Sequence, residues 1–227
     1  TDLAFAVRAL GHQVRYQPAS RVVHDEGTTA GTDAGSGVKA YQARNRQVFA
    51  GKWADALRGR PAPGSVPGPE LLHAAQRRIL FIDEAVPTPD RDSASLRQFN
   101  LLQILRGQGA HVAFLPTGLA HGGAATVALQ QLGVETWYAP FAGSVAAWLG
   151  AHAGRFEVIV VTRHHLAAAL LPLLRRHAPQ ARLVLDSVDL HYLRERRGAQ
   201  LSADPAALRA AEATRERELA AMAAADR

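Results

Sequence analysis

The sequence predicts an α/β protein in which a doubly wound parallel sheet is preceded by a smaller α+β segment. Two observations predict the sheet. Expected strands and helices alternate five times after residue 78, and the strands "ILFI" and "VIVV" are uninterrupted apolar runs. Such runs are typical of strands covered by helices on both faces, as in parallel sheets built from βαβ units. A stretch rich in Pro and Gly precedes them and indicates where the two parts join.

The first part, residues 1–57, contains helix and strand signals but little sequence for a core. Leu3, Val7 and Leu10 recur at helical spacing, and Gly11 suits the left-handed end of that helix. A segment of this size buries little surface, so we expect it to be the end of a larger domain. The expected elements are a helix over 2–10, strands over 13–16 and 21–24, and a helix over 37–57.

A linker is expected over residues 58–77. Its first 13 residues, "RGRPAPGSVPGPE", contain four prolines and three glycines, which break regular structure. The stretch "ELLHAAQRR" at its end predicts a short helix.

The second part, residues 78–227, has the alternation that defines the sheet. No stretch of 20–50 residues repeats, so the alternation reflects topology and not a repeat array. The expected strands are 78–84, 110–116, 135–140, 156–163 and 181–189; the expected helices are 93–109, 124–134, 144–154, 165–179 and 204–227.

Composition excludes several functions. The absence of cysteine excludes disulfides, thiolate metal sites and cysteine nucleophiles. No apolar run reaches the length of about 18 residues that spans a bilayer. No G-x-G-x-x-G follows the first strand, and no P-loop, G-x-S-x-G or H-E-x-x-H motif is present, which argues against NAD binding and P-loop chemistry.

The net charge of +6 is concentrated near the start of the chain, where residues 1–78 contain 11 Lys and Arg against 6 Asp and Glu. These cations do not form a basic stripe interleaved with aromatic residues, so we do not expect nucleic-acid binding. Because the sequence begins with Thr1 and ends within an Ala-rich helical pattern, we expect it to be a piece of a longer polypeptide.

Candidate binding residues follow the strands of the second part. Ligands of open parallel sheets bind beyond the carboxyl ends of the strands. Carboxylates there can accept hydrogen bonds from sugar hydroxyls and arginine can pair with phosphate, so the set suits a hydroxylated or phosphorylated ligand. The alternative is that the carboxylates cap helices and the loops are merely solvated, and Asp92 could be such a cap. The candidates are Asp83, Glu84, Asp90, Arg91, Asp92, Arg163, His164, His165, Asp186 and Asp189.

A second candidate site is the loop that begins "RVVHDEG" in the first part. His24 is followed by Asp25 and Glu26, which is a partial set of ligands for a hard metal ion. Adjacent side chains on an extended segment point to opposite faces, so both carboxylates cannot easily bind one ion. The spacing therefore leaves two hypotheses open, a metal site and an ordinary polar loop.

The segments "TDLAFAVRALGHQVRYQPASRVVHDEG" and "GTDAGSGVKAYQARNRQVF" resemble the end of family 2 glycosyltransferase domains of the GT-A fold. The resemblance covers residues 1–57. It implies that His24 is a ligand of the divalent metal, Mg or Mn, that holds the nucleotide-sugar diphosphate. The catalytic base of that family would fall before Thr1, and Asp2 matches the acid of the following helix.

Residues 78–227 resemble the first, Rossmann-like half of family 4 (group 1) glycosyltransferases of the GT-B fold. The stretches that carry this resemblance are "ILFIDEAVPTPDRDSASLRQFNLLQILRGQGAHVAFLP", "FEVIVVTRHH" and "ARLVLDSVDLHYLRER". The resemblance implies an acceptor-side half-domain without a cofactor, with His164 or His165 near the donor sugar. In place of the Gly-rich loop of many relatives this chain has "PTPDRDSAS", so direct contact of this loop with the donor phosphate is not predicted.

Together the resemblances imply a fragment of a bifunctional glycosyltransferase that uses nucleotide-sugar donors and a glycan or lipid-linked acceptor. The parent would be cytoplasmic. Peripheral attachment to the inner face of a membrane is compatible with this expectation. Each module lacks its donor-binding portion, so the chain alone is expected to be inactive. The alternatives are a non-catalytic flavodoxin-like binding or scaffold domain and a different Rossmann-type enzyme.

Overall fold

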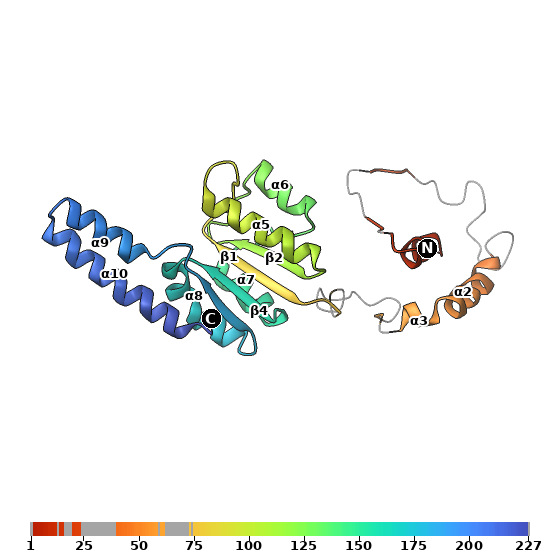
Figure 1. Ribbon diagram of the computed structural model, residues 1–227. Helices are drawn as coiled ribbons and strands as arrows, with labels where there is room; N and C mark the ends of the chain where they lie inside the picture. The colour runs from red at the N-terminus through yellow and green to blue at the C-terminus, as the bar shows by residue number, and fades with distance from the viewer. Residues whose placement is uncertain are drawn as a thin grey trace. The chain divides into compact units, whose positions relative to one another are not determined.

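The chain forms two compact units, Thr1–Pro67 and Gly68–Arg227, each drawn in Figure 1. The boundary falls within the linker expected from the sequence. No helix in the described part of the chain is both long and apolar enough to cross a membrane. The computed structural model describes residues 2–12, 14–15, 20–23, 40–58, 60–61, 73 and 75–226.

The first unit contains three short helices in its described residues, and none of them has a buried residue. The carboxylate of Asp2 accepts hydrogen bonds from Lys52 Nζ at 3.0 Å and from Trp53 Nε1 at 2.6 Å. The ring of Phe5 packs edge-on against Phe49, with centroids 5.1 Å apart. These contacts join α1 to the end of α2. The helices are α1 (Asp2–Ala9), α2 (Tyr41–Lys52) and α3 (Ala54–Leu57).

Several expectations for this region were wrong in the described residues. Val14 and Arg15 lie outside any strand, as do residues 20–23, and the side chains of Val22 and Val23 are exposed. A strand needs a partner for its backbone groups, and the described part of the unit contains none. The helix expected over 37–57 is broken at Trp53. The short helix expected before the sheet is absent from its described residues: 73 and 75 lie in turns, 76 in a bend and 77 in no regular element.

The second unit confirms the predicted α/β class. Its five strands are all parallel, in the order β3-β2-β1-β4-β5. β3 is shorter than expected: only Glu135 and Thr136 pair with β2, Trp137 N donates a last hydrogen bond to Phe114 O at 3.0 Å, and Ala139 N then bonds to Leu119 O outside the sheet. The strands are β1 (Arg78–Asp83), β2 (His111–Pro116), β3 (Glu135–Thr136), β4 (Val158–Thr162) and β5 (Arg182–Asp186).

Helices cover both faces of this sheet. One apolar cluster joins alternate residues of β1 and β2, such as Phe81 and Phe114, to α5 and α6. The other joins the residues between them, such as Leu80 and Leu115, to α7 and α8. The helices of this unit are α5 (Ser93–Gly107), α6 (Ala124–Gln131), α7 (Val145–His152), η2 (Ala153–Arg155), α8 (His164–His177), α9 (His191–Leu201) and α10 (Pro205–Ala224).

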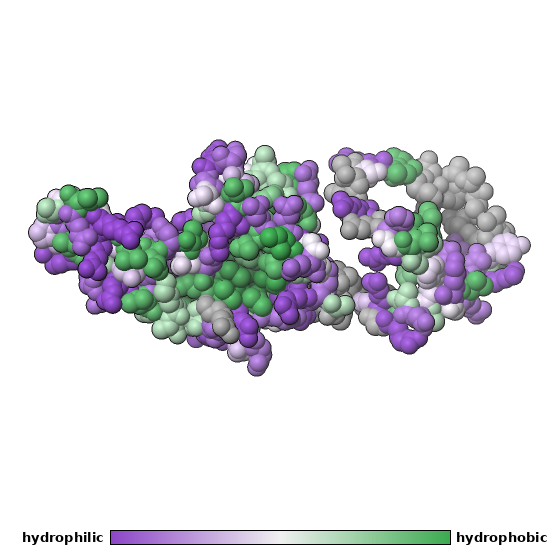
Figure 2. Space-filling model, in the orientation of Figure 1, coloured by the Kyte–Doolittle hydropathy of each residue, from purple (hydrophilic) through white to green (hydrophobic). Residues whose placement is uncertain are grey.

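The cover is uneven on the α5 side. Val158, Val160 and Val184 are only partly buried there, whereas the β1 residues beside them are fully buried. Leu96 and Ile104 of α5 also expose about half of their side chains, 47% and 55%. Figure 2 shows hydrophobic residues gathered over the sheet in the middle of this unit.

The chain after β5 forms a hairpin of two helices, α9 and α10, that extends from the end of the sheet where the strands terminate (Figure 1). α10 packs along α8. A helix over 204–227 was predicted, and α10 begins at Pro205, where Asp204 caps it by accepting hydrogen bonds from Ala206 N and Ala207 N. α9 was not predicted from the sequence. Its first backbone N–H groups, of His191 and Tyr192, donate to the buried carboxylate of Glu218.

We predict that the core of the second unit depends on α5. Leu102 is completely buried between α5 and the sheet, so Leu102→Ala leaves a cavity and lowers the free energy of unfolding by about 2–5 kcal/mol. Leu96→Ala, on the same helix but 47% exposed, serves as the control and costs less than about 1 kcal/mol. Urea unfolding followed by circular dichroism measures both. Equal losses in the two variants would contradict this packing.

Candidate functional site

The candidate site lies beside β1, where the order in which the chain adds strands to the sheet changes direction. The chain adds β2 and β3 on one side of β1, and then β4 and β5 on the other. Ligands of open parallel sheets bind beyond the carboxyl ends of the strands at this switch point. Asp83, Thr162 and Asp186 are the last residues of β1, β4 and β5, and Thr162 and Asp186 are paired in the ladder. The strand ends therefore meet as the sequence predicted.

Asp83 is at the centre of this edge and is almost completely buried. Its Oδ1 accepts hydrogen bonds from Glu84 N at 2.7 Å and from Arg163 Nε at 3.1 Å. Its Oδ2 accepts a longer hydrogen bond, 3.2 Å, from Gln98 Nε2, which also donates to Thr162 Oγ1 at 2.9 Å. Because its oxygens are occupied by these donors, the carboxylate of Asp83 serves to hold Glu84, Gln98 and Arg163 in place.

Arg163 occupies a strained turn between β4 and α8. Its φ of 73° lies in the left-handed region, which is uncommon for residues with a Cβ. Its backbone N–H donates to Asp186 O at 2.9 Å, which ties the turn to β5. Burial lowers the pKa of Arg163. The hydrogen bond to Asp83 and the charges of Asp83 and Glu84 raise it by more, so the pKa of Arg163 is above its ordinary value. Strain of this kind is found at functional sites, where the surrounding contacts maintain it.

Glu84 and His165 form the accessible part of the site. Glu84 Oε1 lies 2.8 Å from His165 Nε2, and Oε2 lies 3.6 Å from Arg163 Nε. The side chains of Glu84 and His165 are 51% and 47% exposed, so a ligand could reach both. Glu84 directly follows β1 and His165 lies in the first turn of α8, so the two side chains face each other across the switch point.

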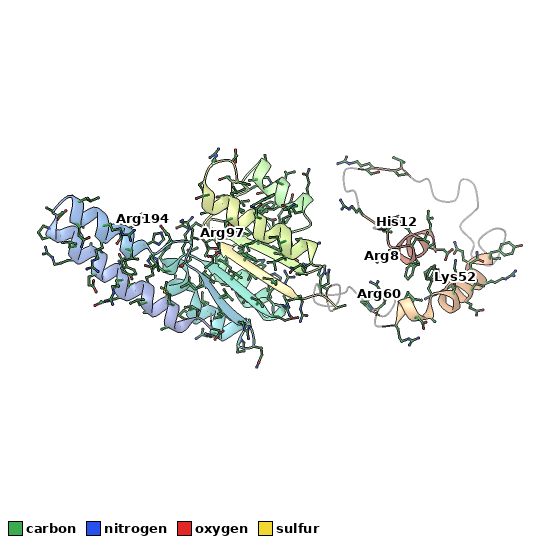
Figure 3. All side chains as sticks on the ribbon, in the orientation of Figure 1. Arg8, His12, Lys52, Arg60, Arg97 and Arg194 are labelled. Atoms are coloured by element: carbon green, nitrogen blue, oxygen red, sulfur yellow. The ribbon has the colours of Figure 1, made fainter. Side chains whose placement is uncertain are left out.

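A second ion pair closes the β5 side of the edge. Arg97 Nη1 donates to Asp186 Oδ2 at 2.6 Å. Arg97 is the fifth residue of α5, and Figure 3 shows it near the carboxyl ends of the strands. Neither Arg97 nor Gln98 was among the candidates from the sequence, because both lie inside a helix and no local motif marks them.

The loop before α5 serves mainly as a cap. Asp92 accepts hydrogen bonds from Ser95 N and Ser95 Oγ, each at 2.7 Å, which is the capping role that the sequence left open. The hydrogen bonds from Ser95 lower the pKa of Asp92. Asp90 and Arg91 are exposed in the turn that precedes it.

His164 and Asp189 face away from Asp83, toward the hairpin. His164 is buried, and burial lowers the pKa of its imidazole. Its Nδ1 lies 3.1 Å from His191 Nδ1, and Asp189 Oδ1 lies 3.3 Å from His191 Nε2. A pocket of about 550 Å³ lies between α8, α9 and α10 beside these residues and is also lined by His165. The structure thus gives the two adjacent histidines different surroundings, although the sequence treated them alike.

Two candidates belong to the first unit. His24, the predicted metal ligand, lies outside the described residues, as do Asp25 and Glu26. Asp2, a candidate catalytic residue, accepts hydrogen bonds from Trp53 and Lys52. Both bonds lower the pKa of Asp2, and the bond from Trp53 has the larger effect.

A further polar cluster lies at the opposite edge of the sheet, where β2 begins. His111 Nε2 lies 2.9 Å from Glu135 Oε2, and Arg155 and Trp137 donate to Glu135 Oε1. The pKa of Glu135 is lowered to about 2: burial would raise it, and the hydrogen bond from His111 and the charge of Arg155 outweigh burial. His73 stacks on His111 with ring centroids 3.6 Å apart.

Fold and site define a Rossmann-like α/β domain with a charged edge at the switch point of its sheet. No protein-family model matches the chain, and no curated protein matches it either.

We predict an acid-sensitive contribution of Glu135 to stability. Because its pKa is lower in the folded than in the unfolded chain, the contribution is present above about pH 4.5 and is lost as the pH falls toward 2. We expect about 2 kcal/mol at neutral pH, since a quarter of the side chain is exposed and solvent screens its pairs. Urea unfolding of wild type and Glu135→Gln between pH 7 and 3 measures it.

The control for this experiment is Glu157→Gln, which removes one carboxylate from a more exposed pair with Arg78. The difference in stability between wild type and Glu135→Gln should shrink as the pH falls. A difference that stays constant over this range would contradict the prediction.

Proposed function

We propose that this chain is part of a bifunctional glycosyltransferase, with the second unit forming the acceptor-side half of a GT-B-type module. The proposal rests on the resemblance of residues 78–227 to family 4 glycosyltransferases and of residues 1–57 to the end of a GT-A domain. The observation that supports it best is the cluster of Asp83, Glu84, Arg163 and His165 at the switch point of the sheet.

The chemistry of this cluster suits a hydroxylated ligand. Glu84 and His165 are accessible and offer both hydrogen-bond donors and acceptors to sugar hydroxyls. Arg163 is held by Asp83, and about one-third of its side chain is exposed. Its guanidinium could therefore bind a phosphate of a donor that is itself bound mainly by a second half-domain. No Gly-rich loop follows β1, so we assign donor phosphate binding mainly to that second half-domain.

In the proposed reaction His165 is the general base, and His164 is not. The oxygen of an acceptor hydroxyl forms a bond to the anomeric carbon of the donor, and the bond from that carbon to the diphosphate breaks. The nucleoside diphosphate leaves with the electron pair, and the hydroxyl proton passes to His165. Since Nε2 of His165 faces Glu84 at 2.8 Å, Nδ1 is the atom left to accept the proton.

The role of the first unit follows from its resemblance alone. In the parent it would complete a GT-A module in which His24 helps to bind Mg²⁺ or Mn²⁺. That ion would stabilise the departing diphosphate. Asp2 is held by Lys52 and Trp53, so we assign it a positioning role in this module.

The proposal implies a nucleotide-sugar donor, a glycan or lipid-linked acceptor, and a cytoplasmic setting in which the parent can attach to the inner face of a membrane. A non-catalytic scaffold is the second candidate. It is favoured by the way Asp83 and Asp186 are already paired with arginines of the chain, as in a purely structural edge.

A transfer assay tests the proposal. The chain alone should not turn over UDP-, GDP- or dTDP-sugars, whereas the parent polypeptide should transfer them to its acceptor. In the parent, His165→Gln should lower kcat by about 10²–10⁴-fold because the general base is lost, with little change in KM.

The matched control is His177→Gln at the opposite end of α8, which should retain activity. Turnover of a nucleotide-sugar by the chain alone would contradict the proposal that donor binding depends on a second half-domain. A parent without transferase activity toward the whole donor panel would favour the scaffold.

A further inference from the structure

A group of metal-ligating side chains lies apart from the Asp83 cluster, where α8 meets the hairpin. His164, His191 and Glu218 come from α8, α9 and α10, and one ligand atom of each lies within 4.8 Å of the others. The three residues are separated in the sequence by 27 positions at each step, so no motif marks them.

The spacing of the two imidazoles suits a shared metal ion. Their Nδ1 atoms lie 3.1 Å apart. Two nitrogens bound to one tetrahedral zinc ion at about 2.0–2.1 Å would be about 3.3 Å apart. Glu218 Oε1 lies 3.8 Å from His164 Nδ1, and one ligand atom of each of the three residues lies within 4.8 Å of the others, so the carboxylate is within reach of an ion shared by the imidazoles.

The groups behind these ligands are arranged as in metal sites. His191 Nε2 lies 3.3 Å from Asp189 Oδ1, and Asp189 is itself paired with Arg194 at 2.5 Å. A metal-binding histidine usually donates its other ring N–H to a carboxylate, which fixes the ring and directs the free nitrogen at the ion. This arrangement leaves Nδ1 of His191 as the ligand atom.

The carboxylate of Glu218 is also held in place. Its side chain is fully buried, and its two oxygens accept hydrogen bonds from His191 N and Tyr192 N, each at 3.2 Å. These bonds fix the carboxylate beside the imidazoles, and each oxygen keeps a lone pair that could bind an ion. A buried carboxylate of this kind is stabilised further by a cation.

One side of the group is open. The pocket of about 550 Å³ between the three helices is lined by His164 and His191, and also by Glu195 and Arg217. An ion held by three protein ligands could take a water molecule or an anion from this pocket as its fourth ligand.

We propose that His164, His191 and Glu218 form a binding site for a divalent transition-metal ion of the zinc class, with one coordination position open to the pocket. The proposal is independent of the glycosyltransferase function. It differs from the expectation that the second unit binds no cofactor. Since the ligands come from three helices, a bound ion would also hold the α9–α10 hairpin against α8.

The cluster of His73, His111 and Glu135 is a weaker candidate. The rings of His73 and His111 are stacked face to face, 10° from parallel, so their lone pairs lie in separate planes and do not converge on one point. Glu135 is already bonded to Arg155 and Trp137.

Titration of the untagged full chain with Co²⁺ and Zn²⁺ tests the proposal. We expect one equivalent of Co²⁺ to bind with a dissociation constant below about 10 μM, to give visible d–d absorption, and to be displaced by Zn²⁺. Zn²⁺ at 100 times its dissociation constant should also raise the unfolding temperature, because it binds only the folded chain.

The variants His164→Gln and His191→Gln should each lose this absorption and the shift in unfolding temperature. His73→Gln and His177→Gln are the controls and should retain both. Circular dichroism in EDTA checks that each variant folds, and Glu218→Gln is avoided because Glu218 also caps α9. Absence of binding to the wild-type chain, or unchanged binding in either His164→Gln or His191→Gln, would overturn the proposal.

Discussion

The contact between the buried carboxylate of Asp83 and Arg163 is the interaction on which the organisation of the sheet edge depends. Asp83 ends the central strand and accepts hydrogen bonds from the backbone of the next residue, Glu84, from α5 through Gln98, and from Arg163 in the β4–α8 turn. It therefore links both sides of the switch point. A buried carboxylate is stable only with such donors, and removing it would leave the Gln98 amide and the Glu84 N–H without this partner, at a cost of about 1–3 kcal/mol for each buried group.

This link gives the two adjacent histidines after β4 their different roles. α8 begins directly after the left-handed Arg163, so His164 and His165 are consecutive helical residues whose side chains point about 100° apart around the helix axis. His165 meets Glu84 at the solvent-exposed edge, and His164 enters the contact with His191 and the hairpin. The proposed catalytic edge and the proposed metal site thus share one structural origin, although each can be tested without the other.

The sequence predicted the parallel sheet because its signal is local: continuous apolar strands and Gly at helix ends lie close to the elements they define. It did not predict α9, because the carboxylate that caps α9 belongs to Glu218, 27 residues later. The same limit applies to the site. The strand-end residues could be predicted from topology, but the roles of Arg97 and Gln98, and the separation of His164 from His165, depend on tertiary contacts.

A double-mutant cycle on Asp83 and Arg163 tests the central claim most directly. Free energies of unfolding would be measured by urea titration at pH 7 for wild type, Asp83→Asn, Arg163→Gln and the double variant. If the contact organises the edge, the effects of the single substitutions are non-additive, with a coupling energy of about 1 kcal/mol or more. Additivity within about 0.3 kcal/mol would contradict the account, because the two side chains would then stabilise the fold independently.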